Sequence, residues 1–355
     1  MLTVVSTIIV LGILIFVHEL GHFLVAKLLG VGVETFSLGF GPRLLGKKVG
    51  ETDYRLSAFP LGGYVKMVGE GGDDEVSPED LERSFAAKKP HKRIAIVAAG
   101  PLFNIVFAFI ILVLTLMIGF PVPTSRIGDV LENKPAAKAG LKKDDVITSV
   151  NGKPVDRFDQ IAGVISASGG KPIDITVNRG GIPLSFRVVP EVRKVKSPLG
   201  ETVETSQIGI GSSREFVTER YGPVDALVKG FGQTCDATGV IVVVIGKLIT
   251  GAIPLDNVGS LIMIGKETGQ QAKAGLVPLL AIMAFLSINL GILNLLPIPI
   301  LDGGHILFCL WEMVSGKPVG LKTREIAQQL GLVLLLGLMV LAFYNDIIRY
   351  VVKQG

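Results

Sequence analysis

The fold is decided first by residues 2–29, which read LTVVSTIIVLGILIFVHELGHFLVAKLL. This stretch is uncharged until it reaches His18, Glu19 and His22, and Lys27 stands near its end. About 20 mostly apolar residues are enough for a helix to cross the ~30 Å hydrocarbon core of a membrane. A charged side chain at membrane depth costs about 2.5–3.5 kcal/mol on insertion scales. The stretch therefore predicts a membrane-spanning helix whose polar residues are kept there to coordinate something.

Three more windows predict membrane-spanning helices, namely 94–120, 276–297 and 327–352. Across the chain, 49% of residues are hydrophobic and only 19% are charged, and the mean hydropathy is +0.55. Two Cys in 355 residues exclude a disulfide scaffold, and this composition excludes a disordered or collagen-like chain. A net charge of +4 gives no indication of nucleic-acid binding. We expect a polytopic α-helical membrane protein with four transmembrane helices and at least one soluble domain.

A fifth apolar run, Gly239–Ile249, is short and contains Lys247. Runs of this length more often lie on the membrane surface than cross the membrane. We therefore interpret it as an amphipathic interfacial segment within a linker that covers residues 196–275.

The distribution of Lys and Arg predicts the orientation of the spans, because cytoplasmic loops carry an excess of these residues. Counted from Lys27 at the end of the first span, eleven of them precede the second span, and three more lie between the last two. Both links are therefore expected in the cytoplasm, and both termini and residues 121–275 outside it. The first span lacks a basic leading region and a small-residue cleavage site, so we expect it to be retained.

Residues 121–195 have the character of a soluble α+β domain. Short β-branched runs at 146–150, 173–177 and 184–189 predict strands, and 159–168 predicts a helix. The run PAAKAGLKKDDVI at 135–147, followed by Val150-Asn151-Gly152, resembles a bacterial PDZ domain. The resemblance implies a groove that accepts an extended peptide by strand addition, opening near 123–127. The alternative is a small β-domain that only blocks access sterically.

The segment His18-Glu19-Leu20-Gly21-His22 is an H-E-x-x-H motif. Residues i and i+4 share one face of a helix, so both imidazoles can reach one metal ion, and Glu19 is placed to take a proton from water. A catalytic zinc needs a third protein ligand. Asp302, in PIPILDGGH, is the favoured candidate. The alternative is His305, with Asp302 as the partner that orients it.

These motifs together resemble the site-2 protease family of intramembrane zinc metalloproteases, in its bacterial RseP-like branch (regulator of sigma-E protease type). The match consists of HELGH at 18–22, GFGP at 39–42, FPLGGYVKM at 59–67, AGPLFN at 99–104 and NLLPIPILDGG at 294–304. It implies a membrane re-entrant β-hairpin over 59–67. The chain departs from the family in having room for a single PDZ domain, where relatives often carry two. Gly259-Ser260 stands where the family commonly has Gly-Pro.

The resemblance also implies the site. His18, His22 and Asp302 would bind Zn²⁺, and Glu19 would be the general base. Substrate would be held by Asn294 and by the hairpin residues Gly62, Gly63, Tyr64, Val65 and Lys66. The chain would divide into 1–120 (first half of the protease core, with a cytoplasmic and re-entrant loop at 30–93), 121–195 (PDZ domain), 196–275 (linker) and 276–355 (second half).

The implied activity is cleavage of single-span membrane proteins in the bacterial cytoplasmic (inner) membrane, with the active site near the cytoplasmic side. Expected substrates are anti-sigma factors already trimmed by an upstream site-1-type protease, or remnant signal peptides. The main alternative is a non-catalytic PDZ-bearing scaffold or quality-control receptor with a structural metal. A metal transporter is disfavoured, because the paired repeats typical of carriers are not evident in the sequence.

Overall fold

The computed structural model describes residues 1–70, 77–78, 80–196 and 202–352. The chain divides into two compact units. We call the first the helical unit; it comprises residues 1–115, 223–247 and 255–355. The second, the strand unit, comprises residues 116–222 and 248–254. Each unit is described by itself.

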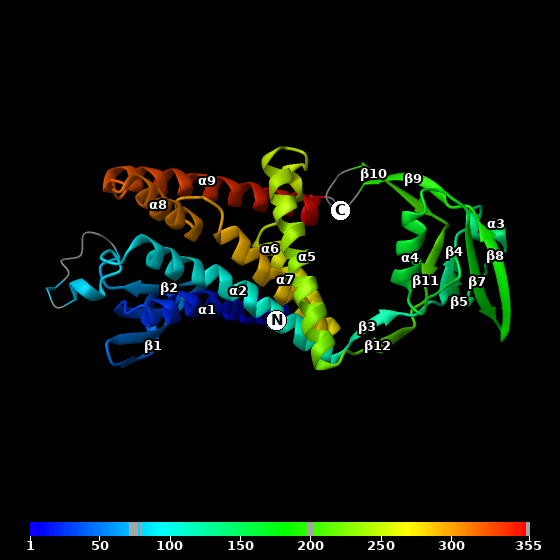
Figure 1. Cartoon of the computed structure of the whole chain (residues 1–355), viewed down its shortest axis with the longest axis horizontal. Coiled ribbons are helices and arrows are strands. Elements are labelled where there is room, and N and C mark those ends of the chain that lie inside the picture. Colours follow the sequence, from blue (N-terminus) through cyan, green and yellow to red (C-terminus); the bar gives the residue numbers. More distant parts are fainter. Residues whose placement is uncertain (71–76, 79, 197–201, 353–355) are drawn as a thin grey trace. The chain divides into compact units, whose positions relative to one another are not determined.

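Among the residues that the structure describes, five helices are long and apolar enough to cross a membrane, and all five are labelled in Figure 1. They are α1 (Leu2–Leu28), α2 (Pro90–Ile118), α5 (Pro223–Ile249), α7 (Leu276–Asn294) and α9 (Leu321–Ile347). The sequence predicted four, so the expected count is not confirmed. The additional candidate, α5, has 27 residues because it continues toward the N-terminus from the apolar run at 239–249. Its most apolar window has a mean hydropathy of 1.4, against 2.2 to 2.7 for the other four.

The core of the helical unit joins α1, α2, α5 and α7. These helices meet through small and branched apolar side chains that are almost fully buried: Val10, Leu14, Ala108, Ile111, Ile241, Ala284 and Ile288. The shorter helices α6 (Leu261–Ala274) and α8 (Asp302–Ser315) complete the unit. At 14 residues each, they are too short to span a membrane.

Beside α1 lies an antiparallel sheet formed by β1 (Val33–Val49) and β2 (Thr52–Met67). Both elements fold back on themselves. Residues 33–38 pair with 63–67 on one side, and residues 35–38 pair with 53–56 on the other, while 43–49 pair with 52–57. The sequence predicted a hairpin over 59–67 alone. The structure places residues 63–67 at one edge of a larger four-stranded arrangement, in which 33–38 and 53–56 lie between 63–67 and 43–49.

The chain is irregular between α7 and α8, from Leu295 to Leu301. Pro297 and Pro299 cannot donate helical hydrogen bonds, so they stop α7 from continuing into α8. Gly303 lies where the start of α8 presses on this segment: a Cβ there would stand 2.2 Å from the carbonyl oxygen of Leu296. Only glycine permits this approach, and it brings Asp302, the first residue of α8, back toward the helical core.

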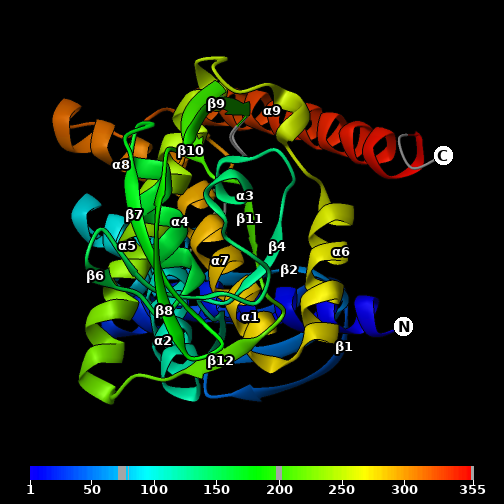
Figure 2. The same ribbon diagram turned by 90° about the vertical axis from the view of Figure 1, so that its right-hand side faces the viewer.

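The strand unit contains a four-stranded sheet of order β6-β5-β7-β8, in which β7 and β8 run side by side (Figure 2). Its strands are β5 (Val146–Val150), β6 (Lys153–Pro154), β7 (Ile173–Arg179) and β8 (Ile182–Val188). The helices α3 (Pro135–Ala139) and α4 (Phe158–Ala167) accompany it. The strands and the helix predicted between 146 and 189 are therefore confirmed, with small changes at their ends.

Three further strand pairs belong to the same unit: β11 with β4, β12 with β3, and β10 with β9. Their bounds are β3 (Phe120–Pro123), β4 (Ile127–Val130), β9 (Glu191–Lys196), β10 (Thr202–Gln207), β11 (Ile210–Ser212) and β12 (Phe216–Glu219). The compact unit therefore extends past the predicted boundary at 195 and takes in residues assigned to a linker. The hydrophobic core includes Ile127, Ile147, Ile161 and Ile175, all fully buried.

A cavity of about 330 Å³ in this unit is lined by one face of α4 and by residues 205–210. The sequence placed a peptide groove near 123–127, and none of those residues lines this cavity. The cavity forms because residues 205–212 fold back beside β4 and α4, a long-range contact that the local strand pattern does not reveal, and the peptide groove stays a prediction.

Candidate metal centre

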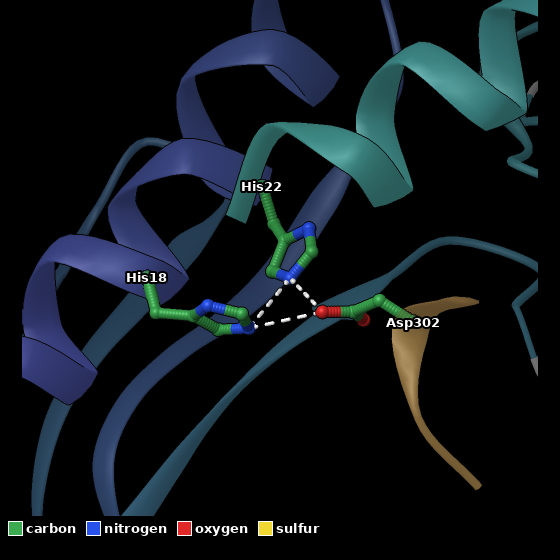
Figure 3. A group of neighbouring side chains, drawn as sticks. All are labelled: His18, His22 and Asp302. Atoms are coloured by element: carbon green, nitrogen blue, oxygen red, sulfur yellow. Dashed lines mark hydrogen bonds and ion pairs between the residues drawn. The ribbon is translucent and has the colours of Figure 1, made fainter. Parts of the chain in front are cut away.

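Three side chains from the two distant motifs converge inside the helical unit (Figure 3). His18 and His22 project from the same face of α1, and Asp302 projects from the first turn of α8. His18 Nε2 lies 3.3 Å from His22 Nε2 and 3.1 Å from Asp302 Oδ2, and His22 Nε2 lies 3.6 Å from the same oxygen. Both imidazoles are buried, and the Asp302 side chain is 20% exposed.

This triangle has the dimensions of a tetrahedral zinc site. Zinc–nitrogen and zinc–oxygen bonds of about 2.0–2.2 Å at tetrahedral angles place neighbouring ligand atoms about 3.3 Å apart. The three observed separations of 3.1, 3.3 and 3.6 Å bracket that value. Two imidazoles and one carboxylate, with the fourth position open, are also a donor set that catalytic zinc accepts. The residues present therefore fit the metal.

Hydrogen bonds within the protein do not account for the burial of the polar atoms that face one another in this triangle. Asp302 Oδ2 is buried and receives no hydrogen bond from the residues that the structure describes. His22 Nδ1 lies 2.9 Å from the carbonyl oxygen of Ile96, so it carries the proton and donates it. The lone pair of His22 Nε2 then points at another imidazole nitrogen and at a carboxylate oxygen. Lone pairs of acceptor atoms that point at one another repel, so a cation is required between them.

Asn104 of α2 orients the other imidazole. Its side-chain amide lies 3.2 Å from His18 Nδ1, and it is fully buried. Its Oδ1 atom has no hydrogen-bond partner among the described residues. The oxygen and nitrogen of an amide are assigned from such networks, and the exchanged orientation lets Oδ1 accept a proton from His18 Nδ1. His18 Nε2 is then free to bind a metal, as His22 Nε2 is.

Glycine allows α1 and α2 to approach closely at this level. A Cβ on Gly100 would stand 2.3 Å from His22 Nε2, and one on Gly21 would stand 2.5 Å from the carbonyl oxygen of Ala99. Any side chain at position 100 would occupy the space of the imidazole that the site needs. The AGPLFN segment at 99–104 thus serves the site twice, through Gly100 and through Asn104.

A cavity of about 190 Å³ opens beside the triangle. Glu19 lines it, together with His22, Asp302 and His305. Of the predicted substrate residues in the sheet, Gly63, Tyr64 and Val65 also line it, whereas Gly62 and Lys66 do not. The Lys66 ammonium pairs with Glu34 at 2.9 Å instead.

Asn294, the last residue of α7, lies close to the metal triangle. Its side-chain amide is 3.4 Å from His18 Nε2, so it can reach a group bound beside the metal. The imidazole of His305 belongs to the cavity but not to the triangle. Its Nδ1 atom accepts a hydrogen bond from Arg324 at 3.2 Å. The geometry therefore groups Asp302, not His305, with the two imidazoles.

Two polar residues of the site were not identified from the sequence. Asn104 was noted only as part of a motif, and Glu70 was not considered. Glu70 lines the same cavity, and burial raises the pKa of its carboxyl above the usual value. Neither residue stands at a regular spacing from the H-E-x-x-H motif, so only the folded chain reveals its position.

Comparison with known proteins shows the family to which this chain belongs. The model of peptidase family M50 matches residues 6–338, nearly the whole chain. The chain belongs to peptidase family M50. A protein of Campylobacter jejuni subsp. jejuni serotype O:2 named "Putative zinc metalloprotease Cj1068" is 39% identical over 349 residues, which cover 98% of this chain and 93% of that protein.

Two further relatives carry the same description. One, from Clostridium perfringens (strain 13), is 38% identical and covers 94% of this chain and 95% of its own length. The other, from Agrobacterium fabrum (strain C58), is 36% identical and covers 97% of this chain and 95% of its own length. The similarity thus includes both the helical unit and the strand unit.

Proposed function

We propose that this chain is a zinc-dependent intramembrane endopeptidase that cleaves single-span membrane proteins. The observation that carries the proposal is the triangle of His18, His22 and Asp302 among apolar helices. His22 and Asp302 line the same cavity as Glu19. The peptidase family and the names of the relatives support a zinc-dependent hydrolase. The apolar helices that form the site support a substrate within the membrane.

The proposed reaction is hydrolysis of a peptide bond. Bound zinc supplies a Lewis acid, which lowers the pKa of water and polarises the substrate carbonyl. Glu19 takes one proton from the attacking water, whose oxygen bonds to the carbonyl carbon. The carbon–nitrogen bond then breaks, and Glu19 delivers the proton to the leaving nitrogen. One water is consumed, and a carboxyl and an amino terminus are released.

A transmembrane helix must open before its peptide bonds become accessible, and unpaired backbone groups in lipid cost several kcal/mol each. We propose that the edge strand 63–67 provides replacement partners for the opened substrate by strand addition. Asn294, with both a donor and an acceptor, would hold a further peptide group near His18. In this proposal the sheet of β1 and β2 enters the membrane from the cytoplasmic side.

For the topology we propose four spans, with α5 on the membrane surface and the strand unit outside the cytoplasm. Two observations support this. His22 near the end of α1 meets Asp302 just after α7, so α1 and α7 must cross the membrane in the same direction. If α5 also crossed, α7 would run the opposite way, and Lys317, Lys322 and Arg324 would lie outside, against the positive-inside tendency.

Labelling with a membrane-impermeant maleimide tests this topology in intact cells. In a chain whose own cysteines are replaced, Lys194→Cys is expected to react from outside and Lys317→Cys only after permeabilisation. Labelling of both positions from outside would contradict the four-span arrangement.

We further propose that the strand unit is a PDZ-like domain that receives or excludes substrate ends, and that substrates have first been trimmed outside the membrane by another protease. Anti-sigma factors and remnant signal peptides have the required single span. The resemblance of residues 135–152 to PDZ sequences and the strand pattern around α4 support this part of the proposal.

The purified full chain, reconstituted with zinc and a single-span test protein in vesicles, tests the function. The wild-type chain is expected to release two fragments from within the span, located by mass spectrometry. Glu19→Gln is expected to keep the zinc and lose cleavage, because the amide cannot take the proton. Equal cleavage by Glu19→Gln would refute the mechanism. Zinc binding without cleavage by the wild-type chain would favour the scaffold with a structural metal.

A further inference from the structure

The edge strand 63–67 presents an open side to the metal centre. It pairs with residues 33–38 on one side only, and no third strand joins it within the described ranges. Gly63, Tyr64, Val65 and Met67 line the cavity that also holds Glu19 and Asp302. An unpaired strand edge of this kind can accept an added chain.

The hydrogen bonds show which backbone groups of this strand point outward. The N–H of Val68 donates to the carbonyl of Gly32 at 2.9 Å, just beyond the pair Val33–Met67. In an antiparallel ladder this identifies Val33–Met67 as a pair that exchanges no hydrogen bonds, so the N–H of Met67 points away from β1. Alternate residues point the same way. Gly63 and Val65 therefore also direct their backbone groups toward the open side.

Of these three outward N–H groups, the one on Met67 is already occupied. It donates to Glu70 Oε2 at 3.1 Å, and Glu70 lines the same cavity. The carboxylate thus lies where the carbonyl of an added chain would otherwise accept. An added chain can therefore pair with the outward backbone groups of Gly63 and Val65, whereas the N–H of Met67 already has an acceptor.

We propose that Glu70 sets the register of the substrate by closing this edge. The inference rests on the proposed function and on strand addition to residues 63–67. A chain paired with Gly63 and Val65 cannot slide on to Met67 without displacing the carboxylate. Because strand side chains alternate between faces, slips that keep the same faces occur in steps of two residues. Glu70 thereby determines which peptide bond lies beside Glu19 and the metal.

The test is the position of the cut that the zinc-loaded full chain makes in a single-span test protein. Glu70→Ala frees the N–H of Met67, so a second cut two residues from the first is expected. Relative to the wild-type chain, the share of product from this second cut is expected to rise about fivefold, the value of one neutral hydrogen bond. Glu70→Gln keeps an acceptor oxygen and is expected to keep the wild-type register. The matched control is Glu34→Ala, which removes a carboxylate from the same sheet outside the cavity.

The outcomes separate this inference from the proposed function. Absence of cleavage by the wild-type chain would refute the proposed function. Wild-type cleavage with the same single cut in Glu70→Ala would overturn only the register inference. Complete loss of cleavage by zinc-loaded Glu70→Ala would overturn it as well, because the proposal gives Glu70 no part in breaking the bond.

Discussion

Two carboxylates with buried oxygens, one in each unit, have opposite surroundings. In the strand unit, Asp145 is 1% exposed, and its carboxylate accepts three hydrogen bonds. Arg179 donates to both of its oxygens at 2.7 and 2.8 Å, and the N–H of Lys142 adds a third bond at 2.8 Å. In the helical unit, Asp302 Oδ2 has no donor among the described residues and faces two imidazole nitrogens.

The difference distinguishes a structural acid from a ligand. A buried carboxylate is stable only when its charge is paired and its oxygens are hydrogen-bonded. Asp145 meets this condition within the protein, so its role is complete when the chain folds. Asp302 does not meet it without a cation. In our proposal, the bound metal ion supplies the charge that completes this second site.

The largest expected effect is on zinc binding. Asp302→Asn removes the charged ligand, and zinc affinity is expected to fall by more than the 10–100-fold typical of losing an outer-shell partner. The measurement is zinc content by elemental analysis after exchange against a chelator. His305→Ala is the matched control, because it alters the same cavity outside the triangle. Equal zinc loss in both variants would contradict the assignment of Asp302.

A smaller effect is expected from Asn104, which orients His18 without touching the metal. Asn104→Ala is expected to weaken zinc binding by about 10–100-fold. Asn104→Asp is expected to restore much of the affinity, since it keeps an oxygen opposite His18 Nδ1. Competition titration with a chelator measures both.

Ser287→Ala controls for packing near Asn104, since it removes only the hydrogen bond from the Ser287 hydroxyl to the Asn104 carbonyl. The role of Asn104 would be refuted if Ser287→Ala weakened zinc binding as much as Asn104→Ala.

Replacing Asp145, the structural acid, is expected to change the stability of the strand unit and to leave zinc binding unchanged. Asp145→Asn is expected to destabilise the strand unit by about 3 kcal/mol, the low end for breaking a buried pair, because Arg179 is 30% exposed. Hydrogen exchange of the backbone amides of β5 and β7 in the full chain measures this. If Asp145→Asn left the hydrogen exchange of these amides unchanged, or if it lost zinc, the proposed difference between Asp145 and Asp302 would be refuted.

The smallest expected effect is on the pH dependence of the strand unit. Burial alone raises the pKa of Asp145, but hydrogen bonds from Arg179 and from the Lys142 N–H outweigh it and hold the pKa below its usual value. The stabilisation is therefore full above the unfolded pKa and is lost as the pH falls through the lower folded pKa. Acid unfolding of β5 and β7 should be less steep in Asp145→Asn. An identical acid profile would show that Asp145 does not contribute.

The same contrast explains what could be predicted from the sequence. His18, Glu19 and His22 lie on one regular helix, so their spacing alone places both imidazoles on one face. Asp302 follows an irregular turn, so no spacing rule identifies it. It was favoured over His305 as the third ligand only because an acid at this place needs a cation. The β5, β7, β8 and α4 elements were predicted because their patterns are local.

What the sequence did not reveal depends on long-range contacts. Asn104 meets His18 across 86 positions, and Glu70 acts on a strand edge whose pairing was unknown. The length of α5 was underestimated because its N-terminal half carries Asp225, Lys229 and Asp236, which end the apolar run without ending the helix.

X-ray absorption at the zinc edge, recorded on the purified full chain, tests whether His18, His22 and Asp302 bind the metal. We expect one zinc per chain, bound by two imidazole nitrogens and carboxylate or water oxygens at about 2.0–2.2 Å. We also expect this signal to disappear in Asp302→Asn. A chain that binds no zinc, or a spectrum with a third imidazole that persists in Asp302→Asn, would refute this metal site.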